Sequence, residues 1–155
     1  MVHVKVHFAL EQDADGYPPV TTEVLWCEQL THGSVKIDNI PFFVRDIACG
    51  DEIRIEADAD GSLLYRSTIK TSGNSVFRVI PTQSVDVDYV RDALDELGCA
   101  VELYSDLRLL AVEVPETVNI LPIVDFLVSS KAKNEIDFEQ AALRHHLPDA
   151  ALEQP

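Results

Sequence analysis

The hydrophobic pattern of the chain changes at Pro81, and this change constrains the fold more than any other feature. Before Pro81, apolar and polar residues alternate in short runs that Gly, Asp, Asn and Pro separate. Such runs are typical of half-buried β-strands joined by turns. After Pro81, Val87, Val90 and Leu94 recur at helical spacing. We therefore expect an all-β half followed by a half that contains helices.

The first half has the pattern of a small, strongly bent sheet. We expect strands over residues 2–10, 21–30, 35–39, 52–57, 63–70 and 75–80. The turns between them carry Gly, Asp, Asn and Ser, which favour tight reversals of the chain. Short strands at this spacing predict an antiparallel β-barrel-like domain over residues 1–80.

The second half predicts an α+β domain over residues 81–155, which shares the strand 75–80 with the first half. Helices are expected over about 86–97 and 120–130, with Asp86 near the first N-terminus and Asn119 as the cap of the second. Strands are expected over 100–104, 107–114 and 135–141, and residues 148–155 form a frayed tail. The order β-α-β-β-α-β resembles the ferredoxin-like sandwich, in which two helices cover one face of an antiparallel sheet.

The stretch Asn39-Ile40-Pro41-Phe42-Phe43 predicts a break in regular structure beside two large side chains. Pro41 restricts its own backbone and that of Ile40, so a strand should end there. Neighbouring side chains of an extended chain point to opposite sides, so Phe42 and Phe43 cannot both enter one core. One should fill the core, and the other should cover a second surface.

Trp26, the only tryptophan, and the polar residues Glu23 and Asn39 allow two interpretations. They form a buried link in which Glu23 or Asn39 holds the backbone around Pro41, or they form an exposed binding surface beside the two phenylalanines. On the first interpretation, Trp26 and Phe42 are core residues, and replacing either by Ala costs about 3 kcal/mol.

The charge excludes some partners and favours others. The 155 residues include 12 basic and 27 acidic ones, a formal charge of -15. Such a surface repels phosphate backbones and argues against nucleic-acid binding, whereas it attracts basic proteins. Glu135, Asp137 and Glu139 fall on one face of a predicted strand and are the candidate acidic surface, with solubility as the simpler explanation.

The sequence carries no recognisable catalytic or metal motif, so we expect no enzyme, no cofactor and no metal site. Cys27, Cys49 and Cys99 are widely spaced and are expected to be buried and unreactive. Two Asp-x-Asp-Gly segments, 13–16 and 58–61, mimic the start of a calcium loop but lack its closing Glu and its helices, so they should be hairpin turns. We expect His3 and His7 to be ordinary surface residues. We expect His145-His146 to be a solvated pair in a mobile tail.

Apolar and polar residues alternate from the N-terminus onward, as in a strand, and show no pattern of a basic and apolar leader. No apolar run reaches the length needed to span a membrane. We therefore expect a cytoplasmic protein without membrane contacts.

Several short motifs together resemble an uncharacterised bacterial family of domains of unknown function. The matching residues are Pro18-Pro19-Val20, Glu23, Leu25-Trp26, Asn39-Ile40-Pro41-Phe42-Phe43, Gly50-Asp51 and Ser72-Gly73. The resemblance covers nearly the whole chain and implies no activity. Small bacterial proteins of this kind are often immunity partners of toxins, and the resemblance implies this role by association.

The sequence therefore predicts a non-enzymatic acidic binding protein, with an immunity protein that neutralises a basic toxin as its specific form. The expected binding residues are Trp26, Asn39, Phe42, Phe43, Glu135, Asp137 and Glu139. The main alternative is a small-molecule-binding regulatory module that uses a cleft between the domains. An enzyme with dispersed catalytic residues is the third hypothesis.

Overall fold

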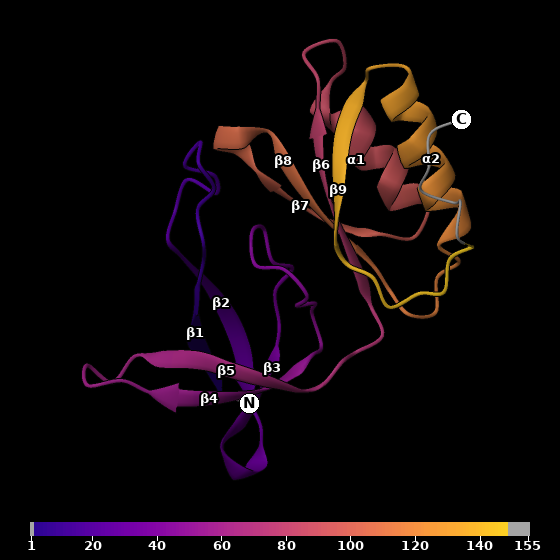
Figure 1. Cartoon of the computed structure of the whole chain (residues 1–155). Helices are drawn as coiled ribbons and strands as arrows, with labels where there is room; N and C mark the ends of the chain where they lie inside the picture. Colours follow the sequence, from indigo (N-terminus) through magenta and orange to yellow (C-terminus); the bar gives the residue numbers. More distant parts are fainter. Residues whose placement is uncertain (1, 149–155) are drawn as a thin grey trace. The chain divides into compact units, whose positions relative to one another are not determined.

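The computed structural model describes residues 2–148, and the chain divides into two compact units, Met1–Ser72 and Gly73–Pro155 (Figure 1). The sequence placed the boundary at Pro81 and treated residues 75–80 as shared. In the structure, the strand β6 (Ser75–Pro81) belongs wholly to the second unit. The predicted tail lies outside the described residues, except for Pro148.

The first unit is a sheet of five strands, β1 (His3–Ala9), β2 (Thr22–Gln29), β3 (Ser34–Ile37), β4 (Glu52–Ala57) and β5 (Leu63–Lys70). Consecutive strands pair antiparallel in chain order. β1 also pairs with β5, in parallel, through Val6–Leu63 and His7–Leu64. The pairing therefore returns from the last strand to the first, although the sequence had suggested antiparallel contacts throughout.

Alternation along the strands places one set of side chains in a single core. Its fully buried members come from β1 to β4 and from the long loop after β3, and they are Val6, Phe8, Leu25, Cys27, Val35, Ile37, Ile47 and Ile53. A 3-10 turn (Thr31–Gly33) joins β2 to β3. β3 ends at Ile37, before Pro41, as the proline predicted.

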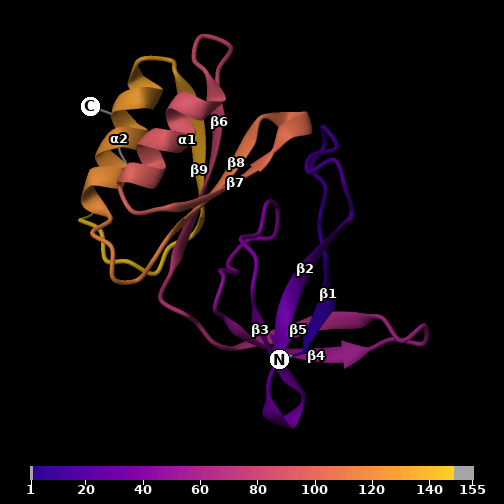
Figure 2. The ribbon, with the colours of Figure 1, turned by 180° about the vertical axis from the view of Figure 1, so that it is seen from behind.

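The second unit has the element order β6, α1 (Val87–Glu96), β7 (Ala100–Tyr104), a 3-10 turn (Ser105–Leu107), β8 (Leu109–Val114), α2 (Leu121–Ala132) and β9 (Ile136–Ala142). Its four strands lie in the order β7-β8-β6-β9, and all neighbours are antiparallel. Both helices cover the same face of this sheet, as the two opposite views show (Figures 1 and 2). The mixed α+β class and the two helices are confirmed.

The ends of α1 follow the predicted capping chemistry, whereas the start of α2 differs by one residue. The Asp86 carboxylate accepts a hydrogen bond from the Asp88 amide at 2.9 Å and caps α1. Gly98, with φ of 100°, takes the left-handed conformation that ends this helix. Asn119 Oδ1 accepts from the Leu121 amide at 3.1 Å, although Ile120 and not Asn119 occupies the cap position of α2.

The segment after β9 differs from the expected solvated tail. His145 is half-buried, its Nδ1 lies 2.6 Å from Ser75 Oγ, and its Nε2 lies 3.0 Å from the Pro115 carbonyl oxygen. Ser75 Oγ also accepts hydrogen bonds from the amides of Arg144 and His145. His146 is exposed. The expectation of a solvated histidine pair is therefore wrong for His145, which fastens the segment to the start of β6.

No helix within residues 2–148 is long and apolar enough to cross a membrane.

Candidate functional site

Trp26 lies on the outer face of β2, not in the core. The inward positions of this strand are Glu23, Leu25 and Cys27, which are at most 8% exposed. The outward positions Val24 and Trp26 are 43% and 46% exposed. The prediction of a core tryptophan is therefore wrong, because alternation on β2 gives the inner face to Leu25 and Cys27.

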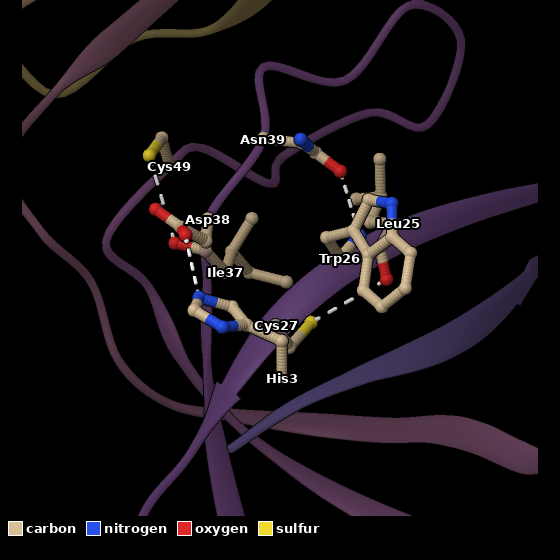
Figure 3. A network of polar contacts seen from close by, with 8 residues as sticks. All are labelled: His3, Leu25, Trp26, Cys27, Ile37, Asp38, Asn39 and Cys49. Carbon is tan, nitrogen blue, oxygen red and sulfur yellow. Dashed lines mark hydrogen bonds and ion pairs between the residues drawn. The ribbon is translucent and has the colours of Figure 1, made fainter. Parts of the chain in front are cut away.

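The backbone of Trp26 is held by the segment that follows β3. Asn39 Oδ1 accepts a hydrogen bond from the Trp26 amide at 2.6 Å, and the Trp26 carbonyl accepts from the Asp38 amide at 2.9 Å. His3 Nε2 lies 3.0 Å from Asp38 Oδ2 and links β1 to the same segment (Figure 3). Lys5 Nζ lies 5.0 Å from the centroid of the indole ring, a cation–π distance. Trp26 is thus an exposed aromatic on a fixed backbone.

Glu23 is a buried carboxylate that binds the backbone after Pro41. It accepts hydrogen bonds from the amides of Phe42 at 2.7 Å, Phe43 at 3.0 Å and Val44 at 2.9 Å. These residues lie outside the strands, and the carboxylate supplies acceptors of the kind that a neighbouring strand provides elsewhere. The prediction that Glu23 or Asn39 holds the backbone around Pro41 is confirmed for Glu23, and Asn39 instead holds Trp26.

The two phenylalanines differ in burial, as the alternation of neighbouring side chains predicted: Phe43 is buried and Phe42 is half-buried. Phe43 is 9% exposed and meets Tyr17 edge-to-face at 6.1 Å, and its ring lies 6.4 Å from that of Phe42. Phe42 is half-buried, and neither belongs to the core cluster. The prediction that Phe42 is a core residue is therefore wrong, because Phe43 takes the buried position of the pair.

Gly50 and Asp51 complete the loop between β3 and β4. Asp51 is fully buried, and its carboxylate accepts from the amides of Ala48 at 3.0 Å and Ser72 at 2.9 Å. The positive φ of Gly50, 88°, allows the sharp turn that brings its amide to the Ile37 carbonyl at 2.7 Å. The Gly-Asp motif is thus a structural part of the first unit.

Two of the three acids predicted on β9 are paired within the second unit. Glu139 lies opposite Arg78 on β6, with a 3.6 Å ion pair, and Arg78 is buried. Asp137 lies 3.3 Å from Lys131 of α2. Glu135 precedes the strand and is half-buried. Two of these acids therefore form ion pairs inside the second unit, and the three together form a weaker acidic surface than the sequence indicated.

A different acidic surface lies along α1, and sequence reasoning missed it. Its exposed residues are Asp88, Tyr89, Asp92, Asp95 and Glu96. Asp88, Asp92 and Glu96 are spaced four residues apart and therefore share one side of the helix. Tyr89 beside them is 60% exposed. In the described part of the chain none of the four acids makes an ion pair. The signal in the sequence was the same helical spacing that identified α1.

The cysteines differ in exposure. Burial raises the pKa of Cys27 and of Cys99 to about 12, with smaller contributions from Asp38 and Cys49 for the first and from Asp95 for the second. Cys49 is half-buried, so the expectation that all three are buried is wrong for this residue. All three are free thiols.

The two Asp-x-Asp-Gly segments form the same hairpin turn. Asp13 Oδ1 accepts from the amides of Asp15 and Tyr17, and Asp58 Oδ1 accepts in the same way from those of Asp60 and Ser62. The first carboxylate of each turn therefore binds its own backbone. Residues 2–148 contain no group of three or more His, Cys, Asp or Glu side chains placed to hold a metal ion.

Two comparisons relate the chain to known proteins. The structure is similar to the crystal structure of a hypothetical protein from Neisseria gonorrhoeae, with a TM-score of 0.78 and 20% sequence identity over 94% of this chain and 99% of that one. At this identity the likeness concerns the fold. No curated protein matches the chain. The family model described as a domain of unknown function, DUF4265, matches residues 23–138, most of the chain. By this match, the chain belongs to the DUF4265 family.

Proposed function

We propose that the protein is a non-enzymatic binding protein that captures a basic protein partner through the outer face of α1. The observation that carries this proposal is the row of exposed acids on α1 beside the exposed Tyr89. Carboxylates without cations of their own are free to pair with a partner's Lys and Arg residues. Tyr supplies an aromatic contact of the kind that dominates many interfaces. A basic toxin is one such partner, and an immunity protein is then the specific form of this function.

The overall charge supports the same proposal. A formal charge of -15 attracts a basic protein over several ångströms and speeds its approach. The acids of β9 contribute less, because Arg78 and Lys131 neutralise two of them. We therefore move the proposed contact from Glu135, Asp137 and Glu139 to Asp88, Asp92 and Glu96.

The proposal includes a finer description of the fold. The pairing of β1 with β5 supports a small β-barrel in the first unit. The strand order β7-β8-β6-β9, with two helices on one face, supports a ferredoxin-like second unit. In that arrangement, the helices offer an outward face that the sheet does not use.

The test is an association experiment with a partner captured from the native host by the tagged protein. The test variant carries Asp88→Asn, Asp92→Asn and Glu96→Gln. The control carries Glu11→Gln, Glu102→Gln and Asp106→Asn, which change the net charge equally at exposed acids elsewhere. We expect a basic partner whose association at low salt is about tenfold slower with the test variant and falls as salt rises. Equal slowing by both variants, or recovery of only neutral and acidic partners, would refute the proposal.

A further inference from the structure

The outer face of the first unit carries a surface whose local charge differs from that of the rest of the protein. Val24 and Trp26 on β2 lie opposite His7 and Lys5 on β1, and His7 lies opposite Leu64 on β5. We call these five residues the Trp26 surface. It contains no carboxylate, although the protein as a whole has a formal charge of -15.

The acids at neighbouring positions already face cations or histidine. Glu56 on β4, which lies opposite Leu64, forms an ion pair with Arg66. Asp38 is bound by His3 at 3.0 Å. Glu28, one outward position beyond Trp26, lies opposite Lys36 on β3. The positive charge of Lys5 is therefore not matched by a carboxylate in the described part of the chain.

Within residues 2–148, two donors on this surface have no acceptor. Lys5 Nζ lies over the indole ring and makes no ion pair or hydrogen bond within residues 2–148, and the indole Nε1–H of Trp26 makes no hydrogen bond there either. An ammonium group and an indole N–H suit the two oxygens of one carboxylate, because charge-assisted hydrogen bonds are the stronger class. The exposed ring, with Val24 and Leu64, provides an apolar platform next to them.

The platform is also rigid. Asn39 binds the amide of Trp26 (Figure 3), and the Asp38 amide binds its carbonyl. A side chain on a fixed backbone loses less conformational freedom when a partner binds, so more of the contact energy appears as affinity.

We propose that the Trp26 surface binds an acidic peptide segment of a partner protein. A carboxylate of that segment accepts from Lys5 and from the indole of Trp26, and an adjacent apolar side chain packs on Val24 and Leu64. This site lies in the other unit from the α1 face, and it prefers the opposite charge. The protein then has two independent binding surfaces, and either proposal can fail without the other.

Nuclear magnetic resonance offers a direct test, because Trp26 is the only tryptophan and gives the single indole N–H signal of the protein. The probes are acetyl-Ala-Leu-Glu-Leu-Ala-amide and its counterparts with Gln or Lys in place of Glu. We expect the Glu peptide to shift the indole signal, with a dissociation constant on the order of 1 mM, and the other two to leave it unchanged. Salt should weaken the binding, because the charged pair is exposed to solvent.

Two variants separate the site from general charge effects. Lys5→Gln should weaken binding of the Glu peptide about tenfold. Lys36→Gln, which removes another exposed lysine, on β3, should change it less than twofold. The proposal is overturned if the Glu peptide leaves the indole signal unchanged at millimolar concentration. It is also overturned if the Gln or Lys peptide binds as well, or if both variants lose affinity equally.

Discussion

The three hydrogen bonds that Glu23 accepts allow us to predict how much this residue contributes to the free energy of unfolding of the first unit. In Glu23→Ala, the amides of Phe42, Phe43 and Val44 lose their acceptor. A buried donor without a partner costs about 1–3 kcal/mol, so three of them sum to as much as about 9 kcal/mol. The loop can shift and admit water, since Phe42 and Val44 are only half-buried. We therefore expect a loss of about 3–5 kcal/mol in the free energy of unfolding.

Glu23→Gln isolates the role of the second oxygen and of the charge. Oε1 accepts from two amides and Oε2 from one, so a glutamine oxygen keeps the first pair. The glutamine NH2 group then faces the Phe42 amide as a second donor. We expect a loss of about 1–2 kcal/mol, from one lost hydrogen bond and the weaker neutral acceptor.

Urea unfolding measures both losses, and the fluorescence of Trp26 follows the first unit because the other unit has no tryptophan. The matched control is Glu28→Gln on the same strand, where no hydrogen bond to the side chain is present in the described residues and a change below about 0.5 kcal/mol is expected. Hydrogen exchange of the amides of residues 42–44 should accelerate only in the Glu23 variants. Equal urea midpoints for Glu23→Gln and Glu28→Gln, with unchanged exchange, would refute the reasoning.

Three further predictions concern other parts of the chain. Trp26→Ala should lower the free energy of unfolding by less than about 1 kcal/mol, because this ring is half-exposed. Phe8→Ala should lower it by about 3–5 kcal/mol, because this ring is 1% exposed, and equal urea midpoints for the two variants would contradict this reasoning. Iodoacetamide should alkylate Cys49 first between pH 7 and 9, because a pKa of about 12 keeps Cys27 and Cys99 protonated there. Peptide mapping by mass spectrometry that finds Cys27 or Cys99 modified first would contradict this prediction. Calcium should not raise the melting temperature above that in a monovalent salt of equal ionic strength, because Asp13 and Asp58 already bind their own turns.

Local patterns predicted the elements well. The alternation from Val2 to Leu10 gave β1, and Asp86 and Gly98 marked the ends of the first helix, because period and capping depend on neighbours in sequence. The period of two on β2 was ambiguous, since Val24 and Trp26 on one face are as apolar as Leu25 and Cys27 on the other. Glu23 decides which face of β2 points inward, because its buried carboxylate binds the backbone of a loop about twenty residues further along the chain. The sequence of β2 alone does not contain this contact.

The candidate site depended on contacts of the same long-range kind. The acids of β9 looked unpaired in the sequence because Arg78 lies on β6, which becomes their neighbour only in the folded sheet. His145 looked solvated because Ser75, its partner, lies at the other end of the second unit. By contrast, the acids of α1 could have been found from helical spacing alone, because they need no distant partner to share a face.

The parallel contact between β1 and β5 also has a kinetic consequence. It joins the two ends of the first unit through only two residue pairs, whereas β1 and β2 share seven. Contacts between distant parts of a chain carry the largest loop-closure cost, so this seam forms late in folding. Because so few residue pairs hold it, we also expect the native unit to open first at this seam. An opened seam exposes two unpaired strand edges, and these edges are where the protein is most prone to associate with copies of itself when it is concentrated or heated.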